Sequence, residues 1–385
     1  MSNHASHHLK IGQIGLGQIT EVHRDGYRCF GLPVVAGTDL SEEVRQKFAN
    51  QNPTARAHAT LEQMLEDSEV DVFDVAAPHQ AKIRRPLLEK VFSAGKPVLL
   101  QKPFAHNYAD ALSYAEMAEA AGVPLMINQN SLFAGGVVDT AARITGPDFS
   151  PLIWGSVRHV SFHDPKGHPW FGKGPRWWMT DMAVHEMAVL HHFFGPPETV
   201  YAVMGQDPHQ TGVEGDGYVH ALFRYPNGAS IVMNENGAYL GPDNKTFLFE
   251  FHGNSGTVSL YPGKHAIWSS RTGESVEEAA TLRWFPEAFG LAMAHFQWAL
   301  NENKTPWASA ADNLFVLAAI EAAYLSSDRG VPVSPAEIMG DRWISHYGPG
   351  FLRGPVDWVP PEPVSSPNLT LNYAWATYIP ENKKS

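Results

Sequence analysis

Residues 10–20 read Lys-Ile-Gly-Gln-Ile-Gly-Leu-Gly-Gln-Ile-Thr, a short apolar run that leads into a Gly-x-Gly turn. The first glycine of the turn, Gly15, permits a tight change of direction, and the second, Gly17, lets backbone amides approach a pyrophosphate. The helix expected after the turn directs its positive N-terminal end at that anion. Thr20 stands at the third glycine position of the pattern. The stretch is typical of the first strand and turn of a dinucleotide-binding sheet, the alternative being an ordinary strand-to-helix turn.

A second apolar run, Pro33-Val-Val-Ala-Gly-Thr-Asp39, ends in an acid. It follows the turn by about twenty residues, where a carboxylate accepts hydrogen bonds from the adenosine ribose of a dinucleotide. Asp39 would repel a 2′-phosphate, and the nearest following cation is Arg45. The sequence therefore favours NAD as the cofactor, with NADP as the less favoured choice. The alternative interpretation of Asp39 is a plain helix N-cap.

Up to residue 130 the chain alternates short apolar runs with amphipathic stretches, which is typical of βαβ units and a parallel sheet. Helix start signals separate these runs: Ser41 before two glutamates, Thr60 with Gln63 three residues later, and Asn107 with Asp110. We expect strands near residues 9–14, 34–38, 70–76, 97–101 and 124–128.

After Asn128 the apolar segments become longer and are separated by turns such as Pro226-Asn-Gly228. This change predicts a second, mostly antiparallel sheet with helices packed on it. The expected fold class is α/β, with an N-terminal Rossmann doubly wound parallel sheet and a C-terminal α+β domain. We expect strands at 153–163, 217–225, 229–239, 245–253 and 256–261, and helices at 133–145, 181–194, 287–303 and 309–327. The expected domains are residues 1–130, 131–339 and a partly ordered C-terminal extension, 340–385, able to wrap a neighbour.

Composition narrows the class of partner. The chain has 385 residues, of which 44% are hydrophobic, and a formal net charge of -12, which disfavours nucleic acid and anionic membranes as partners. Cys29, the single cysteine, excludes an internal disulfide framework and is expected to be a buried thiol in a reducing compartment. Neither an apolar signal segment nor a membrane-spanning run is present, so we expect a cytoplasmic protein that binds small molecules.

Lysine and proline follow the fourth of the expected strands, in the run Val98-Leu-Leu-Gln-Lys102-Pro103. The carboxyl ends of strands are where open α/β sheets carry out their chemistry. An ammonium group there, beside a bound dinucleotide, suggests an alcohol or carbonyl substrate. The alternative is a solvated turn without a catalytic role.

An acid and a histidine four residues apart, Asp181 and His185, lie in an expected helix and therefore on one face of it. An imidazole oriented by a carboxylate is a suitable general base for removing a hydroxyl proton. A surface ion pair, or a buried histidine satisfied by the acid, is the alternative.

The same expected helix carries further residue types that ligate metals. The run His185-Glu186 does not continue into an H-E-x-x-H zinc motif, because Val189 occupies the place of the second histidine. A divalent-ion site built on Asp181 and His185 with distant ligands is the minor alternative. The N-terminal histidines, His4, His7 and His8, are interpreted as a polar tail with at most weak affinity for metal. No metal is predicted.

Taken together, these segments resemble the Gfo/Idh/MocA family, which includes glucose-fructose oxidoreductase and inositol dehydrogenase, over nearly the whole chain. The resemblance rests on motifs that occur in the order of that family: Gly15-Leu-Gly17-Gln-Ile19, Asp39, Ala77-Pro78, Ala94-Gly-Lys-Pro-Val-Leu-Leu-Gln-Lys102-Pro103, Asn128-Gln-Asn130, Asp181-x-x-x-His185 and Phe251-His-Gly253-x-x-Gly256.

The resemblance implies a role for each matching position. Lys102, Asp181 and His185 are expected to be catalytic at the substrate carbinol, although Gln101 replaces the glutamate that usually precedes the lysine. The second domain is expected to hold the substrate on one face of an open sheet and to form a dimer or tetramer through the other. The expected cofactor-binding residues are Gly15, Gly17, Gln18, Ile19, Asp39, Ala77, Pro78, His79, Gln101, Lys102 and Gln129, and the expected substrate residues are Lys102, Asn130, His163, Trp177, Trp178, Asp181 and His185.

The aromatic pair Trp177-Trp178 is included because sugars stack on aromatic faces, with core or interface packing as the alternative. The expected function is NAD-dependent oxidation of a secondary hydroxyl of a sugar, sugar derivative or cyclitol. Two alternatives remain open: a redox-neutral, NAD-dependent enzyme that cleaves glycosides, and a non-catalytic sensor of sugar or dinucleotide.

Overall fold

The computed structural model describes residues 8–163, 172–241, 245–343 and 358–365. The chain divides into two compact units. Unit 1 contains Met1–Ala134, Arg283–Leu314 and Asp357–Pro367, and unit 2 contains Gly135–Leu282, Phe315–Val356 and Asn368–Ser385. The predicted domains, residues 1–130, 131–339 and 340–385, stay a proposal.

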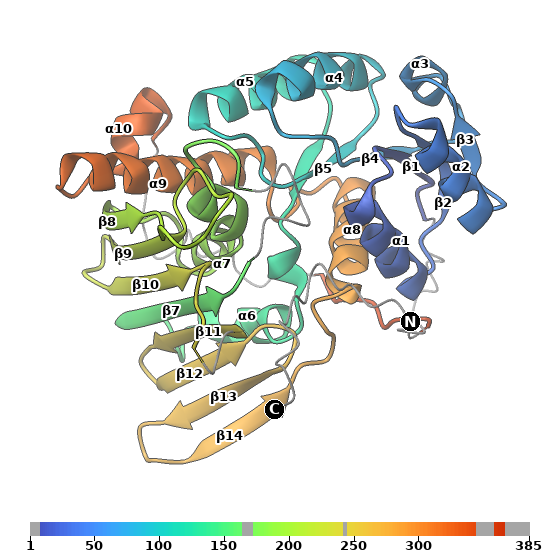
Figure 1. Ribbon diagram of the computed structural model, residues 1–385. Helices are drawn as coiled ribbons and strands as arrows, with labels where there is room; N and C mark the ends of the chain where they lie inside the picture. Colours follow the sequence, from blue (N-terminus) through green and yellow to red (C-terminus); the bar gives the residue numbers. More distant parts are fainter. Residues whose placement is uncertain (1–7, 164–171, 242–244, 344–357, 366–385) are drawn as a thin grey trace, which may run out of the picture. The chain divides into compact units, whose positions relative to one another are not determined.

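Unit 1 is built on a parallel sheet of six strands in the order β3-β2-β1-β4-β5-β6. Its central strands read as short apolar runs because both of their faces are covered and every residue in them is buried. The strands are β1 (Ile11–Ile14), β2 (Val34–Thr38), β3 (Arg56–His58), β4 (Val72–Val75), β5 (Val98–Gln101) and β6 (Leu125–Asn128). The connecting helices are α1 (Gln18–Cys29), α2 (Glu42–Gln51), α3 (Leu61–Leu65), α4 (Ala81–Ser93) and α5 (Tyr108–Ala120) (Figure 1).

The three predicted helix starts are confirmed, since the side chains of Ser41, Thr60 and Asn107 each accept a backbone amide from the first turn that follows. Each bond satisfies one of the amides that a helix N-terminus leaves without a partner.

Helix α8 (Glu287–Asn301) packs on α1 and not on the second sheet, where the sequence had placed it. Two glycines explain this contact: a Cβ on Gly26 would lie 2.5 Å from the carbonyl oxygen of Pro286, and one on Gly290 would lie 2.1 Å from that of Gly26. Only glycine allows the two backbones to approach this closely. The prediction of a helix at residues 287–303 is therefore confirmed, but the prediction that it packs on the second sheet is wrong.

Residues 358–365 of the expected C-terminal extension also pack on unit 1. The Val364 amide donates to the Cys29 carbonyl at 2.7 Å, and the Trp358 indole lies against the rings of Phe133, His295 and Trp307. Cys29 is buried, as predicted, and burial raises the pKa of its thiol to about 11. Most of the other residues of the extension lie outside the described part.

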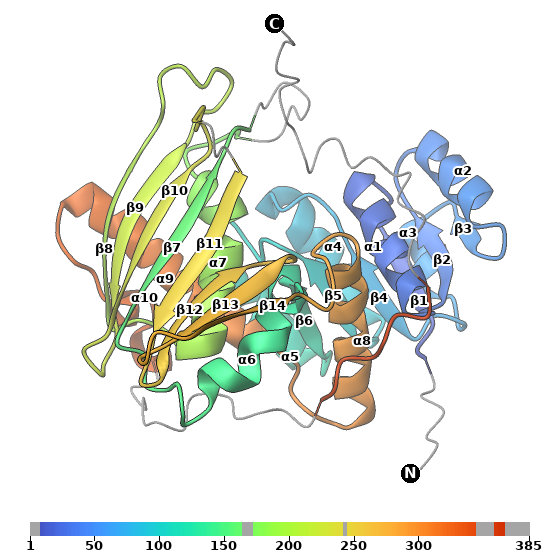
Figure 2. The ribbon, with the colours of Figure 1, turned by 90° about the horizontal axis from the view of Figure 1, so that it is seen from below.

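Unit 2 is built on an eight-stranded sheet in the order β14-β13-β12-β11-β7-β10-β9-β8. Every neighbouring pair is antiparallel except β7 and β10, which are parallel. The strands are β7 (Trp154–Ser161), β8 (Thr199–Gly205), β9 (Tyr218–Arg224), β10 (Ser230–Asn236), β11 (Lys245–His252), β12 (Gly256–Tyr261), β13 (His265–Ser270) and β14 (Ser275–Ala279) (Figure 2). The predicted fold class is confirmed by the two sheets, whereas β3, β8, β13 and β14 were not expected.

The helices of unit 2 cover one face and one edge of this sheet. Phe193 and Phe194 of α7 (Val184–Phe194) pack on Phe251 of β11, so α7 lies against the inner face. The hydroxyls of Ser326 and Ser327, on α9 (Ala310–Arg329), accept backbone amides of β8 and so cover the edge of the sheet. Among the described residues, unit 2 also contains α6 (Val137–Thr145), α10 (Pro335–Met339), the π-helix η3 (Trp178–Met182) and the 3-10 turn η4 (Gly340–Arg342), and unit 1 contains the 3-10 turn η1 (Asn130–Phe133). Within the described ranges, every helix is too short or too polar to cross a membrane.

Candidate functional site

The Gly-x-Gly turn connects β1 to α1 at the carboxyl edge of the parallel sheet. Gly15 has a φ of 86°, and a Cβ at that position would lie 2.5 Å from the carbonyl oxygen of Ala76. Gly17 is the exposed N-cap of α1 and gives it no side-chain cap, and a Cβ there would meet no heavy atom within 4 Å. The Thr20 hydroxyl closes the turn by donating to the Gly17 carbonyl at 2.7 Å. An accessible, uncapped helix start of this kind fits a dinucleotide pyrophosphate.

Asp39 connects the end of β2 to this turn. Its Oδ2 accepts the Leu16 amide at 2.8 Å, and its Oδ1 accepts the Ser41 amide at 2.9 Å. The N-cap of α2 is Ser41, so the alternative interpretation of Asp39 as a plain N-cap is wrong. Each carboxylate oxygen has a further lone pair with which it can accept a ribose hydroxyl. The Arg45 guanidinium donates to the Asp39 carbonyl at 2.7 Å and so lies beside the same strand end.

A buried arginine of α4, Arg84, joins the segments that follow β4 and β5. Its guanidinium donates to the carbonyls of Ala77 at 2.8 Å and Phe104 at 3.0 Å, and also to that of Pro103. It therefore fixes both the predicted cofactor segment at Ala77 and the backbone that immediately follows Lys102. Sequence reasoning missed Arg84, because the Arg-Arg pair at 84–85 reads as a solvated helix face.

The same edge carries several positive charges. The rings of His79 and His106 lie 4.1 Å apart. Burial, followed by the charges of His106, Arg84 and Lys102, lowers the pKa of His79 to about 2. An imidazole with so low a pKa is a poor proton acceptor, which disfavours acid–base chemistry at His79.

A buried hydrogen-bonded chain lies under Lys102. The Asp74 carboxylate lies 3.0 Å from His23 Nδ1, and His23 Nε2 lies 3.3 Å from the side-chain nitrogen of Gln101 and 3.4 Å from that of Asn128. Gln101 Oε1 in turn accepts the Lys102 backbone amide at 2.8 Å. The backbone that presents the Lys102 side chain is thus fixed by side chains from β4, α1 and β5. Asp74 also accepts bonds from Gln13 and Tyr27.

The end of β6 supplies two further predicted residues, both buried. Gln129 donates to Asn313 at 2.9 Å, and Asn130 accepts the Trp284 indole N–H at 2.6 Å. The structure therefore places the predicted residues of unit 1 at the carboxyl ends of β1, β2, β4, β5 and β6, which is the edge where doubly wound sheets bind their ligands.

The predicted acid–base segment of unit 2 begins in a π-helix. Asp181 lies within η3, in which the Ala183 amide donates to the Trp178 carbonyl, and His185 lies in the first turn of α7. The expectation of one regular helix from residue 181 is therefore corrected. π-helical turns occur frequently at functional sites. Asp181 is 8% exposed, and His185 is partly exposed.

A buried carboxylate, Asp216, holds the start of this segment. Its two oxygens accept the backbone amides of Trp177 at 2.8 Å and Met179 at 2.7 Å, and Oδ1 also accepts the Tyr324 hydroxyl at 2.9 Å. Burial raises the pKa of Asp216, and these three donors oppose the shift. No sequence signal identified Asp216, because its partners come from distant parts of the chain.

The tryptophan pair lies in the interior of unit 2. Trp177 and Trp178 are both 0% exposed, their rings meet edge to face at 5.4 Å, and Trp178 also meets the ring of His163. A sugar can stack only on an exposed aromatic face, so this structure favours the alternative of core packing. His163 follows β7 and is partly exposed.

Comparison with known proteins identifies the family. The description "Oxidoreductase family, NAD-binding Rossmann fold" matches residues 9–129, and "Oxidoreductase family, C-terminal alpha/beta domain" matches residues 173–334. The chain belongs to the Gfo/Idh/MocA family of oxidoreductases. It is 26% identical over 338 residues to a D-apiose dehydrogenase of Paraburkholderia graminis, which covers 84% of this chain and 88% of that protein. It is also 28% identical over 201 residues to a trans-1,2-dihydrobenzene-1,2-diol dehydrogenase of Mus musculus, covering 50% of this chain and 56% of that protein.

Solved structures share the fold. An oxidoreductase from Agrobacterium radiobacter, in complex with NAD+, L-tartaric acid and magnesium, has a TM-score of 0.77 at 22% identity and covers 86% of this chain and 99% of its own. A levoglucosan dehydrogenase in complex with NADH and levoglucosan has a TM-score of 0.73 at 16% identity and covers 85% of this chain and 99% of its own.

Replacing Arg84 by methionine should lower the free energy of unfolding by about 2–4 kcal/mol, because buried carbonyls lose their donors. Denaturant titration measures the change. Arg85→Met is the matched control: Arg85 is 40% exposed and 3.8 Å from Asp110, so its loss should cost no more than about 1 kcal/mol. Equal losses in the two variants would show that the three carbonyl bonds do not stabilise this edge.

Replacing Asp216 by asparagine should lower the free energy of unfolding by about 1–3 kcal/mol, because an amide nitrogen cannot accept one of the two backbone amides. Turnover should fall as well, since the segment before α7 loses an anchor. Asp207→Asn is the control, because that carboxylate accepts the His209 amide on an exposed loop. A fully stable and active Asp216→Asn protein would contradict the anchoring role.

Proposed function

We propose that the protein is an NAD-dependent oxidoreductase that transfers a hydride between nicotinamide and a secondary hydroxyl or ketone of a sugar, sugar derivative or cyclitol. The observation that carries the proposal is the position of Lys102 at the carboxyl end of β5, on the same edge as the uncapped turn at Gly15–Gly17. Family membership supports the reaction class. The names of relatives that include D-apiose dehydrogenases support the substrate class.

Each catalytic group has a separate task. His185 takes the hydroxyl proton, Asp181 orients its imidazole, and the Lys102 ammonium stabilises the charge that develops on the carbinol oxygen. Bound NAD would supply the hydride acceptor in its nicotinamide ring. Asn130 and His163 are proposed to contact the substrate, and no metal is required for these steps.

The uncapped start of α1 would hold the pyrophosphate, and Asp39 would hold the adenosine ribose. Gln18, Ile19, Ala77, Pro78, His79, Gln101 and Gln129 complete the proposed cofactor site. NAD is proposed over NADP because a 2′-phosphate would face the Asp39 carboxylate, although Arg45 beside the same strand end reduces this repulsion.

Asp39→Asn should weaken NAD binding about tenfold, equivalent to about 1.4 kcal/mol, because the ribose loses a charged acceptor. NADP binding should weaken less, so the preference for NAD over NADP should narrow. Titration of both dinucleotides by calorimetry measures the ratio. Asp71→Asn is the control, because Asp71 also accepts a backbone amide, that of Lys10, but at the opposite edge of the sheet. An unchanged ratio would remove Asp39 from cofactor selection.

Lys102→Ala should leave NAD affinity nearly unchanged while turnover falls by roughly 10²-fold or more, because the carbinol oxygen loses its cationic partner. NADH formation from a panel of sugars, glycosides and cyclitols provides the assay and identifies the substrate. Lys96→Ala is the matched control, since Lys96 precedes the same strand and donates to the Asp67 carbonyl. Normal turnover by Lys102→Ala would refute its assignment.

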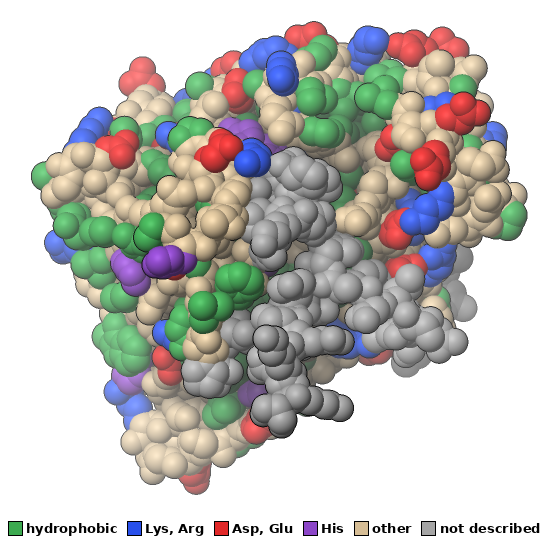
Figure 3. Space-filling model, viewed as in Figure 1, with side chains coloured by type: hydrophobic (Ala, Val, Ile, Leu, Met, Phe, Trp, Pro, Cys, Tyr) green, Lys and Arg blue, Asp and Glu red, His purple; other side chains and the backbone are tan. Residues whose placement is uncertain are grey.

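A homo-oligomer is proposed through the outer face of the second sheet. Hydrophobic side chains gather on the left of the view in Figure 3, over strands β8 to β10. On β7 to β10, five large apolar residues are 37–51% exposed, a pattern that marks contact surfaces: Trp154, Tyr201, Val203, Leu222 and Val232.

A further inference from the structure

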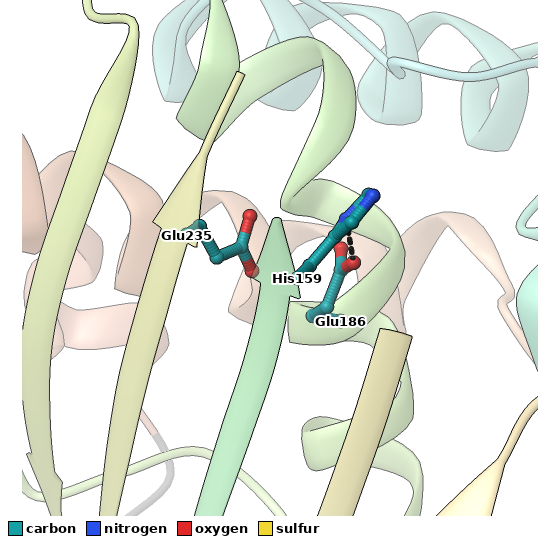
Figure 4. Close-up of side chains that lie close together, drawn as sticks. All are labelled: His159, Glu186 and Glu235. Atoms are coloured by element: carbon teal, nitrogen blue, oxygen red, sulfur yellow. Dashed lines mark hydrogen bonds and ion pairs between the residues drawn. The ribbon is translucent and has the colours of Figure 1, made fainter. Parts of the chain in front are cut away.

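Three metal-ligating side chains meet in the interior of unit 2. His159 of β7 and Glu235 of β10 are direct partners in the parallel pair, so their side chains leave the same face of the sheet. Glu186 of α7 reaches this face, and its Oε1 lies 2.6 Å from His159 Nδ1. One ligand atom from each residue lies within 4.8 Å of the other two (Figure 4).

The two carboxylates are deeply buried and incompletely satisfied. Glu186 and Glu235 are both 0% exposed. One oxygen of each has a partner, since Glu186 Oε1 faces His159 and Glu235 Oε2 accepts the Trp178 indole N–H at 2.7 Å. The second oxygens, Glu186 Oε2 and Glu235 Oε1, are buried without a hydrogen-bond partner among the residues that the structure describes. A buried carboxylate oxygen of this kind is costly unless a donor or a cation satisfies it.

The electrostatic surroundings favour a cation. Two ionised carboxylates, Glu186 and Glu235, would place like charges close together in the interior of unit 2. A more distant charge that also acts on Glu235, that of Asp216, is negative as well. A positive ion between the two carboxylates would reduce the repulsion and satisfy both remaining oxygens.

We propose that His159, Glu186 and Glu235 bind one divalent transition-metal ion. Imidazole suits zinc, iron and nickel, and carboxylates suit manganese and magnesium, so a mixed set favours zinc or manganese over magnesium. Ligand atoms about 2.0–2.2 Å from a tetrahedral ion lie about 3.3–3.6 Å apart, so side-chain movements of up to about 1 Å would close this cluster around an ion.

The proposed metal site would join three elements that are far apart in the sequence. The ion would hold β7, β10 and α7 together, next to the π-helical turn that contains Asp181. The His159 side chain is 14% exposed and both glutamates are buried, so the ion would enter past the imidazole. None of the three ligands is a residue to which we assign the reaction, so the site is additional to the proposed function.

The test is calorimetric titration of the full chain with zinc and, separately, manganese, after dialysis against a chelator. The wild-type protein should bind one equivalent at this site, and Glu235→Gln and Glu186→Gln should weaken that binding by about tenfold or more, since each loses a charged ligand. Zinc should raise the melting temperature of the wild type more than that of either variant.

Glu277→Gln is the matched control, because Glu277 forms an exposed pair with His265, 3.8 Å apart, in the same unit. It should bind metal as the wild type does. Zinc held by His4, His7 and His8 would be the same in all these proteins and would cancel in the comparison.

X-ray absorption of the zinc-loaded wild type provides a measurement that needs no variant. It should show imidazole nitrogen together with carboxylate oxygen around the ion. The proposal is overturned if the wild type binds neither metal, if both glutamine variants bind zinc as tightly as the wild type, or if the absorption spectrum shows histidine nitrogen alone. Failure to bind either metal would indicate that Glu186 and Glu235 instead share a proton.

Discussion

Where the chain passes from a strand into a loop, its backbone N–H and C=O groups lose the partners that the sheet provided. Polar side chains at these strand ends supply new partners. At the carboxyl edge of the parallel sheet, Arg84 supplies donors for carbonyls that follow β4 and β5, and Asp39 supplies acceptors for amides that follow β1 and β2. Each side chain joins two loops and thus fixes one relative to the other. The loops that carry the proposed cofactor residues are therefore joined to one another by hydrogen bonds that the backbone itself requires, before any ligand is considered.

Unit 2 shows two different outcomes for buried carboxylates. Asp216 accepts two backbone amides and a hydroxyl, so its charge is compensated by donors and it anchors a neighbouring segment. Glu186 and Glu235 lie close together with one donor each and an open oxygen each. The first arrangement is complete within the protein, whereas the second requires either a proton or a cation. We therefore interpret Asp216 as a structural residue, and Glu186 and Glu235 as candidate metal ligands.

The parts of the fold that depend on local pattern were predictable. Buried apolar runs located β1, β2, β4, β5 and β6, and the glycine pattern located the turn. Of the four strands missed in the sequence, β8 and β13 do contain apolar residues. The other two, β3 and β14, lie at sheet edges and carry little hydrophobic signal: β3 reads Arg-Ala-His, and β14 reads Ser-Val-Glu-Glu-Ala and is exposed throughout. They are strands only because a neighbour pairs with them.

The candidate site divides in the same way. Lys102, Asp39 and the turn glycines follow strand ends directly, so their edge of the sheet could be read from the sequence. Arg84, Asp216 and Glu235 could not be found, because the partners that define their roles lie seven or more residues away or on another strand. The π-helical turn at Trp178–Met182 was missed because a four-residue spacing assumes an α-helix.

Gln101, which replaces the glutamate common before the family's lysine, is explained by what lies beneath it. Its amide nitrogen faces His23 Nε2 and its oxygen accepts the Lys102 amide, so an amide satisfies one acceptor and one donor at once. The other imidazole nitrogen of His23 already faces the Asp74 carboxylate. A glutamate at position 101 would therefore add a second carboxylate to a buried chain that holds one, and would offer His23 Nε2 an acceptor where it needs a donor. The hydrogen-bonding groups of His23 and Gln101 are thus complementary. Glutamine at position 101 holds the Lys102 backbone in place without adding a negative charge beside it.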